Sequence, residues 1–520
     1  MIITTVARVA ASVALAGAVA LSAGVSASAQ DDEGSAVTPQ AGGDADLTVM
    51  ARNLYLGADY VVALELLPDV AAAAQYMWDQ VADTNFDERA AELAAEIERY
   101  GPDVVGLQEA TVWGCRTGLF GGVTPIFDFT EGLIDALAET GLDYVVAEAD
   151  GVTADNPGQE IPAVPFVTTV TDPENLQPAL GRDSAYCGYY IGDALLVRAD
   201  LADDVLRVGN TEFDERAPIV PVVFTISRGY TWADIAFAGT TVRVVTAHLE
   251  AYVNEDGPPS GAVQAQQLVE DLAETTVPLV VMGDFNADPR DPRAPDDPNP
   301  GEQPVANDAC SAQPDSPTLE TANVECNAFW VMLDAGFTHA GPDPFDRAND
   351  TWGSAANLAG PDPDRLAVAL DRGNEAGFTD RLDHIFLANG ATAVSAEVFG
   401  NEWPDGDDLW ECSSQDQVAT TEESSAILAD VGEAEPVTGT GVCLPTDHAG
   451  TVAVVDVSAG PSGVVEDPPP PDHDSFTISL LGWLAIILGV LVLLVVLAVW
   501  GVVHVVRRRR RKRREAQPVA

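Results

Sequence analysis

PLVVMGDFNADP, residues Pro278–Pro289, is the most informative stretch of this sequence. Its apolar run, Pro278–Met282, predicts a buried strand, and the run stops at a glycine that precedes Asp284 and Asn286. A strand that ends in this way carries two polar side chains to the rim of a sheet. Gly, Asp and Asn are also common turn residues, so GDFN alone is equally typical of an ordinary strand-to-loop turn.

Other polar residues stand at or beside the ends of predicted strands. They are Asn53, Glu109, His248, Asp383, Asp447 and His448. Each of them accompanies an apolar or β-rich run or a loop next to such a run, as Asp284 does. The recurrence favours a functional interpretation of GDFN over a simple turn.

The order of predicted elements indicates a layered α/β protein. A short strand, Leu47–Arg52, is followed by helical spacing of Ala90, Leu93 and Ile97, and a second strand, Val104–Leu107, comes directly after Gly101 and Pro102. Further strands are expected at Ala194–Val197, Pro221–Ile226, Thr241–Thr246, Ile385–Leu387 and Thr451–Val455, and helices at Gln264–Ala273 and Phe329–Leu333. The pattern also allows Pro221–Ile226 and Thr241–Thr246 to form a hairpin.

Both ends of the 520-residue chain carry apolar segments. The first 29 residues end in Ala27-Ser28-Ala29 and are typical of a cleaved secretory signal peptide, although an uncleaved N-terminal membrane helix is the alternative. Residues 476–506 form an almost unbroken apolar run that is long enough to cross a bilayer. The cationic run Arg507–Arg514 follows, which predicts a cytoplasmic C-terminus and an extracellular domain.

These features divide the chain into six predicted parts. They are a signal peptide (1–29), a disordered lead-in (30–45), a folded domain (46–458), a Pro-rich stalk (459–475), a transmembrane helix (476–506) and a basic cytoplasmic tail (507–520).

The charge of the exported part limits the partners that it can bind. The whole chain carries 25 basic and 82 acidic residues; without Arg8, the basic run and Glu515, 16 basic and 81 acidic residues remain, a net charge of -65. Such a surface repels polyanions. Binding a long nucleic acid would therefore need high salt or a local basic groove.

Six cysteines lie between the signal and the membrane segment, and an even number in an exported segment favours three disulfides. Pairing in chain order is preferred among the fifteen possible connectivities, because each bond then closes a local loop or joins neighbouring elements. The pairs would be Cys115–Cys187, Cys310–Cys326 and Cys412–Cys443. The last two fall in long polar inserts, 287–326 and 401–443, that such bonds would keep ordered.

The residue types at the predicted strand ends suit hydrolysis of a phosphate ester. That reaction needs a hard cation on the phosphoryl oxygens, a base for the attacking water and a donor for the developing charge. Carboxylate and amide oxygens dominate the set, and neither H-E-x-x-H nor C-x-x-C occurs. The set therefore favours Mg²⁺, Mn²⁺ or Ca²⁺ over zinc.

Seven motifs resemble, in the same order, those of the endonuclease/exonuclease/phosphatase superfamily, the deoxyribonuclease I-like proteins. They are ARN (51–53), GLQEA (106–110), GDALLVR (192–198), VVTAHL (244–249), GDFNADP (283–289), DRLDHIF (380–386) and TDHAGTV (446–452). The resemblance extends from about Leu47 to Val457. It implies a four-layer α/β sandwich with two packed, mostly antiparallel sheets.

The resemblance also implies a role for each candidate residue. Glu109 would be the principal metal ligand, with Asn53 and Asp447 beside it. His448 would contact the scissile phosphate and Asp383 would orient it. Asp284 would align and deprotonate the attacking water, Asn286 would hold the phosphate, and His248 would donate a hydrogen bond to the developing charge. Asp193 departs from the small, amide or apolar residue that is usual at its position, which leaves substrate specificity open.

The sequence therefore predicts an extracellular, membrane-anchored, divalent-metal-dependent hydrolase of phosphomono- or phosphodiesters. Its substrate could be a small molecule, a lipid headgroup or a nucleic acid, and we expect a monomer. The alternatives are an extracellular nuclease that degrades DNA or RNA and a non-catalytic surface binding protein on the same scaffold. Loss of the metal-binding or histidine residues would mark the last of these, and none is lost.

Overall fold

The structure is a computed structural model. It describes residues 46–58, 63, 66, 69–118, 122–156, 168–220, 224–251, 257–294, 305–353, 372, 374, 376–402, 444–461, 463, 467, 469 and 470. The predicted signal peptide, lead-in, transmembrane helix and basic tail lie outside these residues. Within the described part of the chain, no helix is both long and apolar enough to cross a bilayer.

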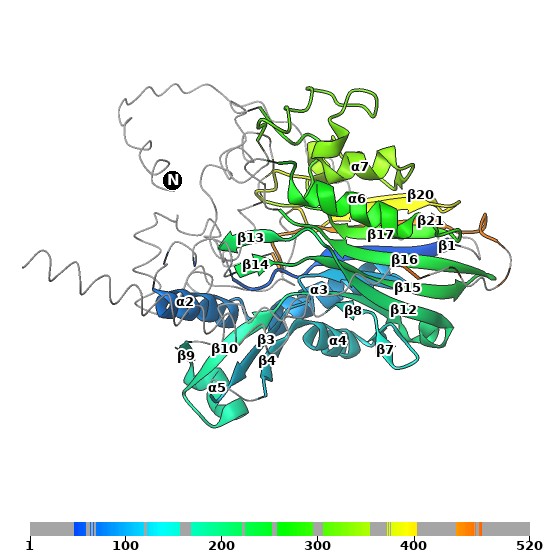
Figure 1. The fold of residues 1–520 in the computed structure, drawn as a ribbon. Coiled ribbons are helices and arrows are strands. Elements are labelled where there is room, and N and C mark those ends of the chain that lie inside the picture. Colours follow the sequence, from blue (N-terminus) through cyan, green and yellow to red (C-terminus); the bar gives the residue numbers. More distant parts are fainter. Residues whose placement is uncertain are drawn as a thin grey trace, which may run out of the picture. The chain divides into compact units, whose positions relative to one another are not determined.

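Two large sheets form the centre of the domain (Figure 1). The first sheet contains β1 (Asp46–Asn53), β2 (Val104–Gln108), β5 (Tyr144–Val146), β8 (Asp155–Asn156), β11 (Asp193–Arg198), β20 (Thr392–Phe399) and β21 (Gly450–Asp456). The second contains β12 (Val205–Glu212), β15 (Gly229–Phe237), β16 (Thr240–His248), β17 (Leu279–Asp284), β18 (Thr338–His339) and β19 (Asp383–Ala388). Strands β1 and β2 pair in parallel, as do β16 and β17, and the other pairs in both sheets are antiparallel.

The two sheets pack face to face through a continuous apolar core. Residues from β1, β2 and β21 share one buried cluster with residues from β15, β16 and β17. The approach is close at Gly106 of β2, where a Cβ would lie 2.7 Å from the Thr246 hydroxyl and 2.8 Å from the Met282 methyl group. The strands are β-branched and apolar on both faces, as expected for sheets that are covered on both sides.

Helices cover the outer faces of the two sheets and complete four layers (Figure 1). The helices are α2 (Val70–Asp83), α3 (Phe86–Tyr100), α4 (Phe129–Thr140), α5 (Pro173–Leu180), α6 (Ser260–Leu272) and α7 (Ala328–Asp334), with short 3₁₀ turns at Ala199–Asp204, Val324–Cys326 and Arg347–Asn349. Helices α2, α3 and α4 share a buried cluster with the first sheet, and α6 and α7 share one with the second. The predicted layered α/β fold with packed, mostly antiparallel sheets is therefore confirmed.

Smaller sheets extend the domain at its edges. One consists of β3 (Val112–Arg116), β4 (Thr124–Asp128), β9 (Thr169–Thr171) and β10 (Ser184–Tyr190), and two ribbons pair β13 (Ala217–Val220) with β14 (Phe224–Ile226) and β6 (Glu148–Ala149) with β7 (Val152–Thr153).

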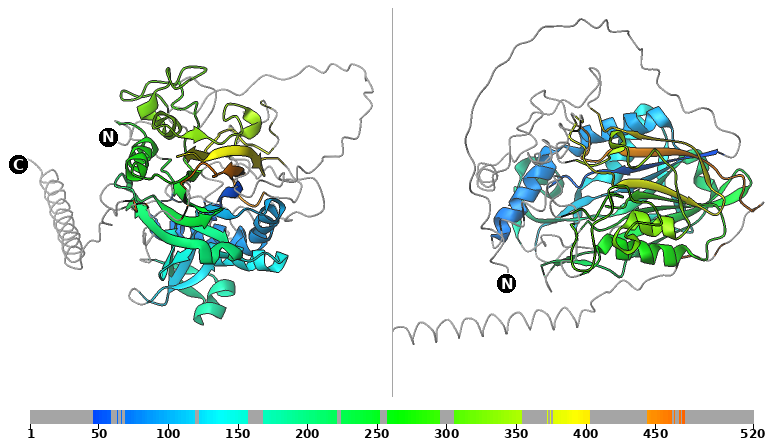
Figure 2. Two further views of the ribbon diagram at one scale, coloured as in Figure 1. Left: turned by 90° about the vertical axis from the view of Figure 1, so that its right-hand side faces the viewer. Right: turned by 90° about the horizontal axis from the view of Figure 1, so that it is seen from above.

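The first and last strands of the domain lie side by side. Strand β21 pairs with β1 on one edge and with β20 on the other (Figure 2). Asp46, where β1 begins, is paired with Asp456, where β21 ends. The two ends of the folded domain therefore leave the first sheet at the same place.

Most of the predicted elements are present, and one predicted pairing is wrong. Helix α3 begins after Asn85 and ends at Gly101, whose φ of 53° suits glycine. The hairpin partner of β16 is β15, rather than the Pro221–Ile226 strand. The described part of that strand, Phe224–Ile226, pairs with β13 instead. Only two residues separate β15 from β16, and such a short turn favours pairing between these adjacent strands over pairing with a more distant segment.

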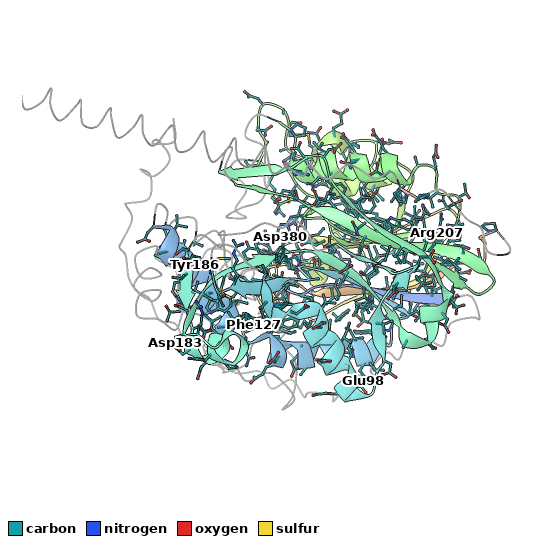
Figure 3. All side chains as sticks on the ribbon, turned by 60° about the horizontal axis from the view of Figure 1, so that its bottom comes forward. Glu98, Phe127, Asp183, Tyr186, Arg207 and Asp380 are labelled. Carbon is teal, nitrogen blue, oxygen red and sulfur yellow. A yellow bond between two sulfur atoms is a disulfide. The ribbon has the colours of Figure 1, made fainter. Side chains whose placement is uncertain are left out.

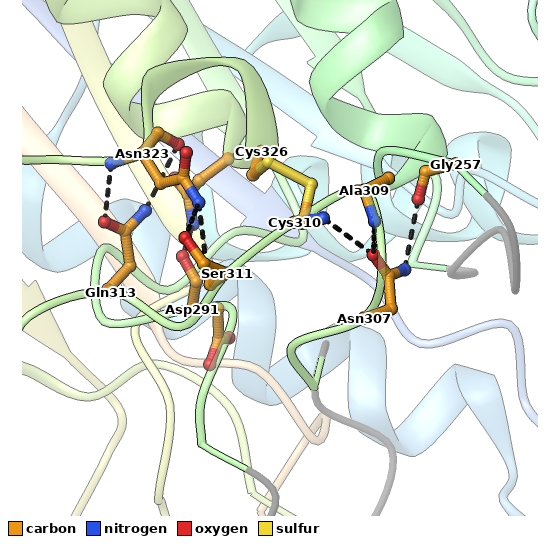
Figure 4. The surroundings of a disulfide bond; sticks show 10 residues. Gly257, Asp291, Asn307, Ala309, Cys310, Ser311, Gln313, Asn323 and Cys326 are labelled. Carbon is orange, nitrogen blue, oxygen red and sulfur yellow. Dashed lines mark hydrogen bonds between the residues drawn. A yellow bond between two sulfur atoms is a disulfide. The ribbon is translucent and has the colours of Figure 1, made fainter.

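Two of the three predicted disulfides are confirmed. Cys115–Cys187 joins β3 to β10, and Cys310–Cys326 closes part of the first insert. Beside the second bond, the Asn307 side chain accepts hydrogen bonds from two backbone amides, and Asn323 donates to Ser311 (Figure 4). The predicted Cys412–Cys443 pair lies outside the described residues.

Candidate active site

Strand ends from both sheets meet at one edge of the paired sheets and carry most of the predicted site. In the second sheet, the parallel register sets His248 opposite Asp284, and the antiparallel register sets Asp284 opposite Asp383. In the first sheet, Asn53 is opposite Gln108, the residue before Glu109. Asp447 and His448 lie just before β21, separated from it by Ala449. The topology thus brings together residues that are up to almost 400 positions apart in the chain.

Glycine is required where the GDFN motif leaves the sheet. Gly283 has a φ of 137°, and a Cβ at this position would lie 2.0 Å from the Ala247 carbonyl oxygen. The backbones of β16 and β17 therefore approach more closely than any other residue allows. Their contact fixes His248 and Asp284 relative to each other.

Asp284 lies at the centre of the site, and its carboxylate is surrounded by donors. Its Oδ2 is 3.1 Å from Asn53 Nδ2, 3.5 Å from His248 Nε2 and 3.6 Å from His448 Nε2. Its Oδ1 accepts a hydrogen bond from the Asn286 backbone amide. Burial raises the pKa of Asp284 to about 7, although the positive charge of His448 acts in the opposite direction.

His448 is held by Asp383 and is protonated at neutral pH. Its Nδ1 lies 2.9 Å from Asp383 Oδ2, and the Asp383 amide in turn donates to the Thr351 hydroxyl. Burial lowers the pKa of His448, but the carboxylates of Asp383 and Asp284 raise it by more, to about 10. The ring is therefore a cation that is fixed in orientation.

His248 has the opposite electrostatic environment. Arg228 Nη1 lies 3.1 Å from its Nδ1, and Arg228 also pairs with Glu250 at 3.5 Å. Burial, and next the positive charge of Arg228, holds the pKa of His248 well below its usual value. A guanidinium can only donate, so Nδ1 accepts and the ring proton is on Nε2, towards Asp284.

Glu109 and Asp447 form a second acidic group beside this centre. Burial raises the pKa of Glu109, and the charge of Asp447 raises it further; burial likewise raises the pKa of Asp447. Glu109 also has a φ of 52°, a left-handed conformation that is uncommon outside glycine. Two neighbouring carboxylates, one buried and one half-buried, need a proton or a cation between them, and their oxygens suit a hard divalent ion.

These residues fit a divalent metal ion, with Glu109 and Asp447 as its candidate ligands. Asn53, the third predicted ligand, donates to Asp284 through its amide nitrogen, and its Oδ1 accepts from the Tyr55 amide at 2.9 Å. That oxygen keeps a second lone pair for a ligand. Among the described residues, Asp284, Asp383 and His448 also bring one ligand atom each within 4.8 Å of one another.

Asn286 is positioned by the backbone around it. It has a φ of 46°, and its Nδ2 donates to the Leu249 carbonyl at 2.8 Å. One amide hydrogen remains for a phosphate oxygen. All eight predicted residues thus lie at this edge of the sheets or directly beside it.

Several residues that build the site were not predictable from the sequence. Arg228 had no recognisable motif, and neither had Arg89, which donates to the carbonyls of Leu54 and Pro445. Trp352 donates to Asp447 Oδ2 at 3.2 Å from a loop that had no predicted role. A buried arginine in an otherwise apolar segment was the one signal that could have identified Arg228.

Asp193 lies in a small pocket beside His248, lined by residues 191–193 and 227–229. It is buried, and its Oδ1 has no hydrogen-bond partner among the described residues. Burial raises the pKa of Asp193 well above the usual range, although Arg228 opposes this. The residue that departs from the superfamily pattern therefore borders the candidate active site.

Residues 81–448 match the Endonuclease/Exonuclease/phosphatase family, and the chain belongs to that family. Its members typically hydrolyse phosphate esters, and the described sheets and helices agree with the family's sandwich fold. No curated protein sequence matches the chain.

Solved structures that are similar to the chain share little sequence with it. A TDP2 from D. rerio complexed with a single-strand DNA product is 15% identical, with 79% of this chain and 99% of that one covered and a TM-score of 0.36. A mannosyl-6-phosphatase from Bacteroides thetaiotaomicron is 12% identical, with the same coverage and a TM-score of 0.37. A family protein from Leptotrichia buccalis is 13% identical, again with the same coverage and a TM-score of 0.38.

Proposed function

We propose that the chain is an extracellular, membrane-anchored phosphoesterase that depends on a divalent metal ion. The observation that carries this proposal is the placement of the Asp284 carboxylate between two histidines of opposite character. His448 is a fixed cation paired with Asp383, and His248 is neutral with its proton on Nε2. Such a set can take a proton from water, bind anionic oxygens and donate a hydrogen bond.

Each of these residues has a distinct role in the proposed reaction. Asp284 is the base that aligns and deprotonates water, since burial brings its pKa to about 7, near the working pH. His448 binds the negatively charged phosphate, and Asp383 keeps the ring charged and oriented. His248 donates from Nε2 to the charge that develops in the transition state. Asn286 holds a phosphate oxygen through its remaining amide hydrogen.

Glu109, Asp447 and Asn53 would hold Mg²⁺, Mn²⁺ or Ca²⁺ beside these groups. The bound ion would neutralise the phosphoryl oxygens as a Lewis acid. The raised pKa values of the two carboxylates support this assignment, because burial is the main cause of both shifts and a bound cation offsets the cost of burying negative charge.

The extracellular location and the membrane anchor rest on the sequence alone. The signal-like residues 1–29 and the apolar run 476–506 with its basic flank support them. The substrate is a phosphate ester, either a small molecule or a lipid headgroup, because the acidic exported part disfavours long polyanions.

The full chain, purified in detergent, would test the proposal. It would be assayed with Mg²⁺, Mn²⁺ or Ca²⁺ against small phosphate esters, sphingomyelin, DNA and RNA. Glu109→Ala and His448→Ala should abolish turnover, whereas Asp334→Ala, an exposed change at the end of α7, should not.

Two results would contradict this function. Turnover of none of these substrates with any metal would favour a binding protein, and full activity in both site variants would disprove the assigned site. Hydrolysis restricted to DNA or RNA would favour the nuclease alternative.

A further inference from the structure

The site lies at one end of the long strands, and the chain leaves the domain at the other end. His448 lies two residues before the start of β21, which runs away from the site and ends at Asp456. Asp46, the start of β1, is paired with Asp456. The nine-residue strand β16, from Thr240 to His248, measures the distance between these two ends as roughly 26 Å.

The chain after β21 is docked onto the end that is remote from the site. A Cβ on Gly460 would lie 2.6 Å from Pro278 Cγ, so this glycine packs directly on the residue before β17. The Thr240 hydroxyl donates to the Pro461 carbonyl at 2.8 Å, and the Gly463 amide donates to the Gly239 carbonyl at 2.8 Å. These partners are the starts of β16 and β17 and the turn before β16.

Asp467 fastens the docked segment most firmly. It is 5% exposed, and its carboxylate accepts hydrogen bonds from the amides of Thr276 and Val277 and from the Thr276 hydroxyl. Arg207 donates to its backbone carbonyl. Burial raises the pKa of Asp467, but these donors lower it by more. Figure 3 shows Arg207 well away, along the strands, from Asp380, which lies near the site.

We infer that these docked residues, Gly460, Pro461, Gly463 and Asp467, which we call the Asp467 clamp, hold the active site away from the membrane that carries the protein. The enzyme then acts on phosphate esters that arrive from solution and does not reach lipid headgroups of its own bilayer. The inference rests on the anchor at 476–506 that forms part of the proposed function.

The short linker between Pro470 and the predicted membrane helix supports an orientation in which the site end faces away from the bilayer. Pro470 is still buried, and the chain from there to residue 476 spans at most roughly 20 Å when extended. That is less than the roughly 26 Å length of β16, so the site end cannot point straight at the bilayer while the segment stays docked. A chain released at Val457 would reach roughly 65 Å, which is enough to turn it. The acidic surface also disfavours close approach to anionic headgroups.

The orientation can be measured without any catalysis. The full chain would be placed in lipid vesicles with an energy-transfer acceptor on the headgroups and a donor fluorophore introduced at one exposed position. Ser458 marks the docked end, and Glu402, which follows β20 close to where β20 meets the start of β21, marks the site end. Transfer should be strong from Ser458 and weak from Glu402. Equal transfer from both positions in the wild-type chain would overturn the inference.

Substitutions that disrupt the clamp form the second part of the experiment. Asp467→Ala, and the milder Thr276→Val, should raise transfer from Glu402, while Asp334→Ala should leave it unchanged. If Asp467→Ala unfolds the chain, Thr276→Val alone decides this arm. Unchanged transfer in a folded clamp variant would contradict the assigned role.

Hydrolysis would then separate the two sources of phosphate ester. In vesicles, the wild type should cleave soluble bis(p-nitrophenyl) phosphate and show no hydrolysis of sphingomyelin in its own bilayer, because the docked segment leaves the end of the domain that is remote from the site. Sphingomyelin cleavage in the wild-type vesicle equal to that in detergent micelles would overturn the inference. Failure to cleave any substrate would instead disprove the proposed phosphoesterase, and the transfer measurement would still decide the orientation.

Discussion

Asp383→Asn tests whether the charge on His448 is what the site needs. The amide oxygen of asparagine can still accept the hydrogen bond from His448 Nδ1, which spans 2.9 Å in the structure. The substitution therefore removes the negative charge and keeps the shape. Any loss of rate would then report the electrostatic contribution of Asp383.

The expected size of the effect follows from the pKa of His448. The difference between 6.5 and about 10 corresponds to about 5 kcal/mol in favour of the protonated ring. The charges of Asp383 and Asp284 both contribute to this stabilisation of the protonated ring. The Asp383→Asn variant should therefore lose about half of it, roughly 2 to 3 kcal/mol. At pH near and above 10, that loss corresponds to a decrease in kcat of roughly 30- to 150-fold, because the ring of the variant has already lost its proton there, whereas at pH 7 the ring is still protonated.

The assay is kcat and KM for a soluble phosphodiester, measured across pH. The alkaline limit of activity should move from about 10 towards 6.5, since the ring loses its proton more easily without Asp383. Asp334→Asn serves as the matched control, because that carboxylate is exposed at the end of α7. An unchanged kcat together with an unmoved alkaline limit would refute the role of Asp383.

Three further predictions concern pH, a disulfide and a glycine. In the wild type, kcat/KM should rise with pH through about 7, where Asp284 loses its proton, and fall near 10, where His448 loses its proton. A flat pH–rate profile would contradict this prediction. Replacing Cys115 and Cys187 together by serine should lower the free energy of unfolding by about 4 kcal/mol for a 72-residue separation, and urea unfolding measures the loss. Gly283→Ala should cost about 3 kcal/mol or more, because its Cβ would lie 2.0 Å from the Ala247 carbonyl; wild-type stability in the same unfolding assay would contradict this explanation.

The site was largely predictable because its residues stand where apolar runs stop. Asp284 and His248 are the last residues of two buried strands, and the parallel pairing of these strands places the two residues opposite each other. The order of these motifs along the chain identified the family before any geometry was known. Local pattern and sheet topology agree at these positions.

Residues that depend on strand pairing were not predictable. Arg228 contacts His248 because Gly229 is opposite His248 in the β15–β16 hairpin. The sequence pattern allowed Pro221–Ile226 as the hairpin partner of β16, so a contact between Arg228 and His248 was not expected. The same holds for the Asp467 clamp, whose partners at Thr276 and Val277 lie 190 positions earlier in the chain. Proline-rich composition indicates an extended chain and contains no information about such a docking surface.

The pairing of β1 with β21 also has a consequence for biosynthesis. The first sheet cannot be completed until residues 450–456 have been made, because they form the strand beside β1. At about 5 to 20 residues per second, synthesis of the intervening 400 or so residues takes roughly 20 to 80 seconds. During that time β1 lacks its partner β21, and the candidate residues for the metal, the base and the phosphate are not yet together. The candidate active site can therefore be assembled only when translation of the domain is almost complete.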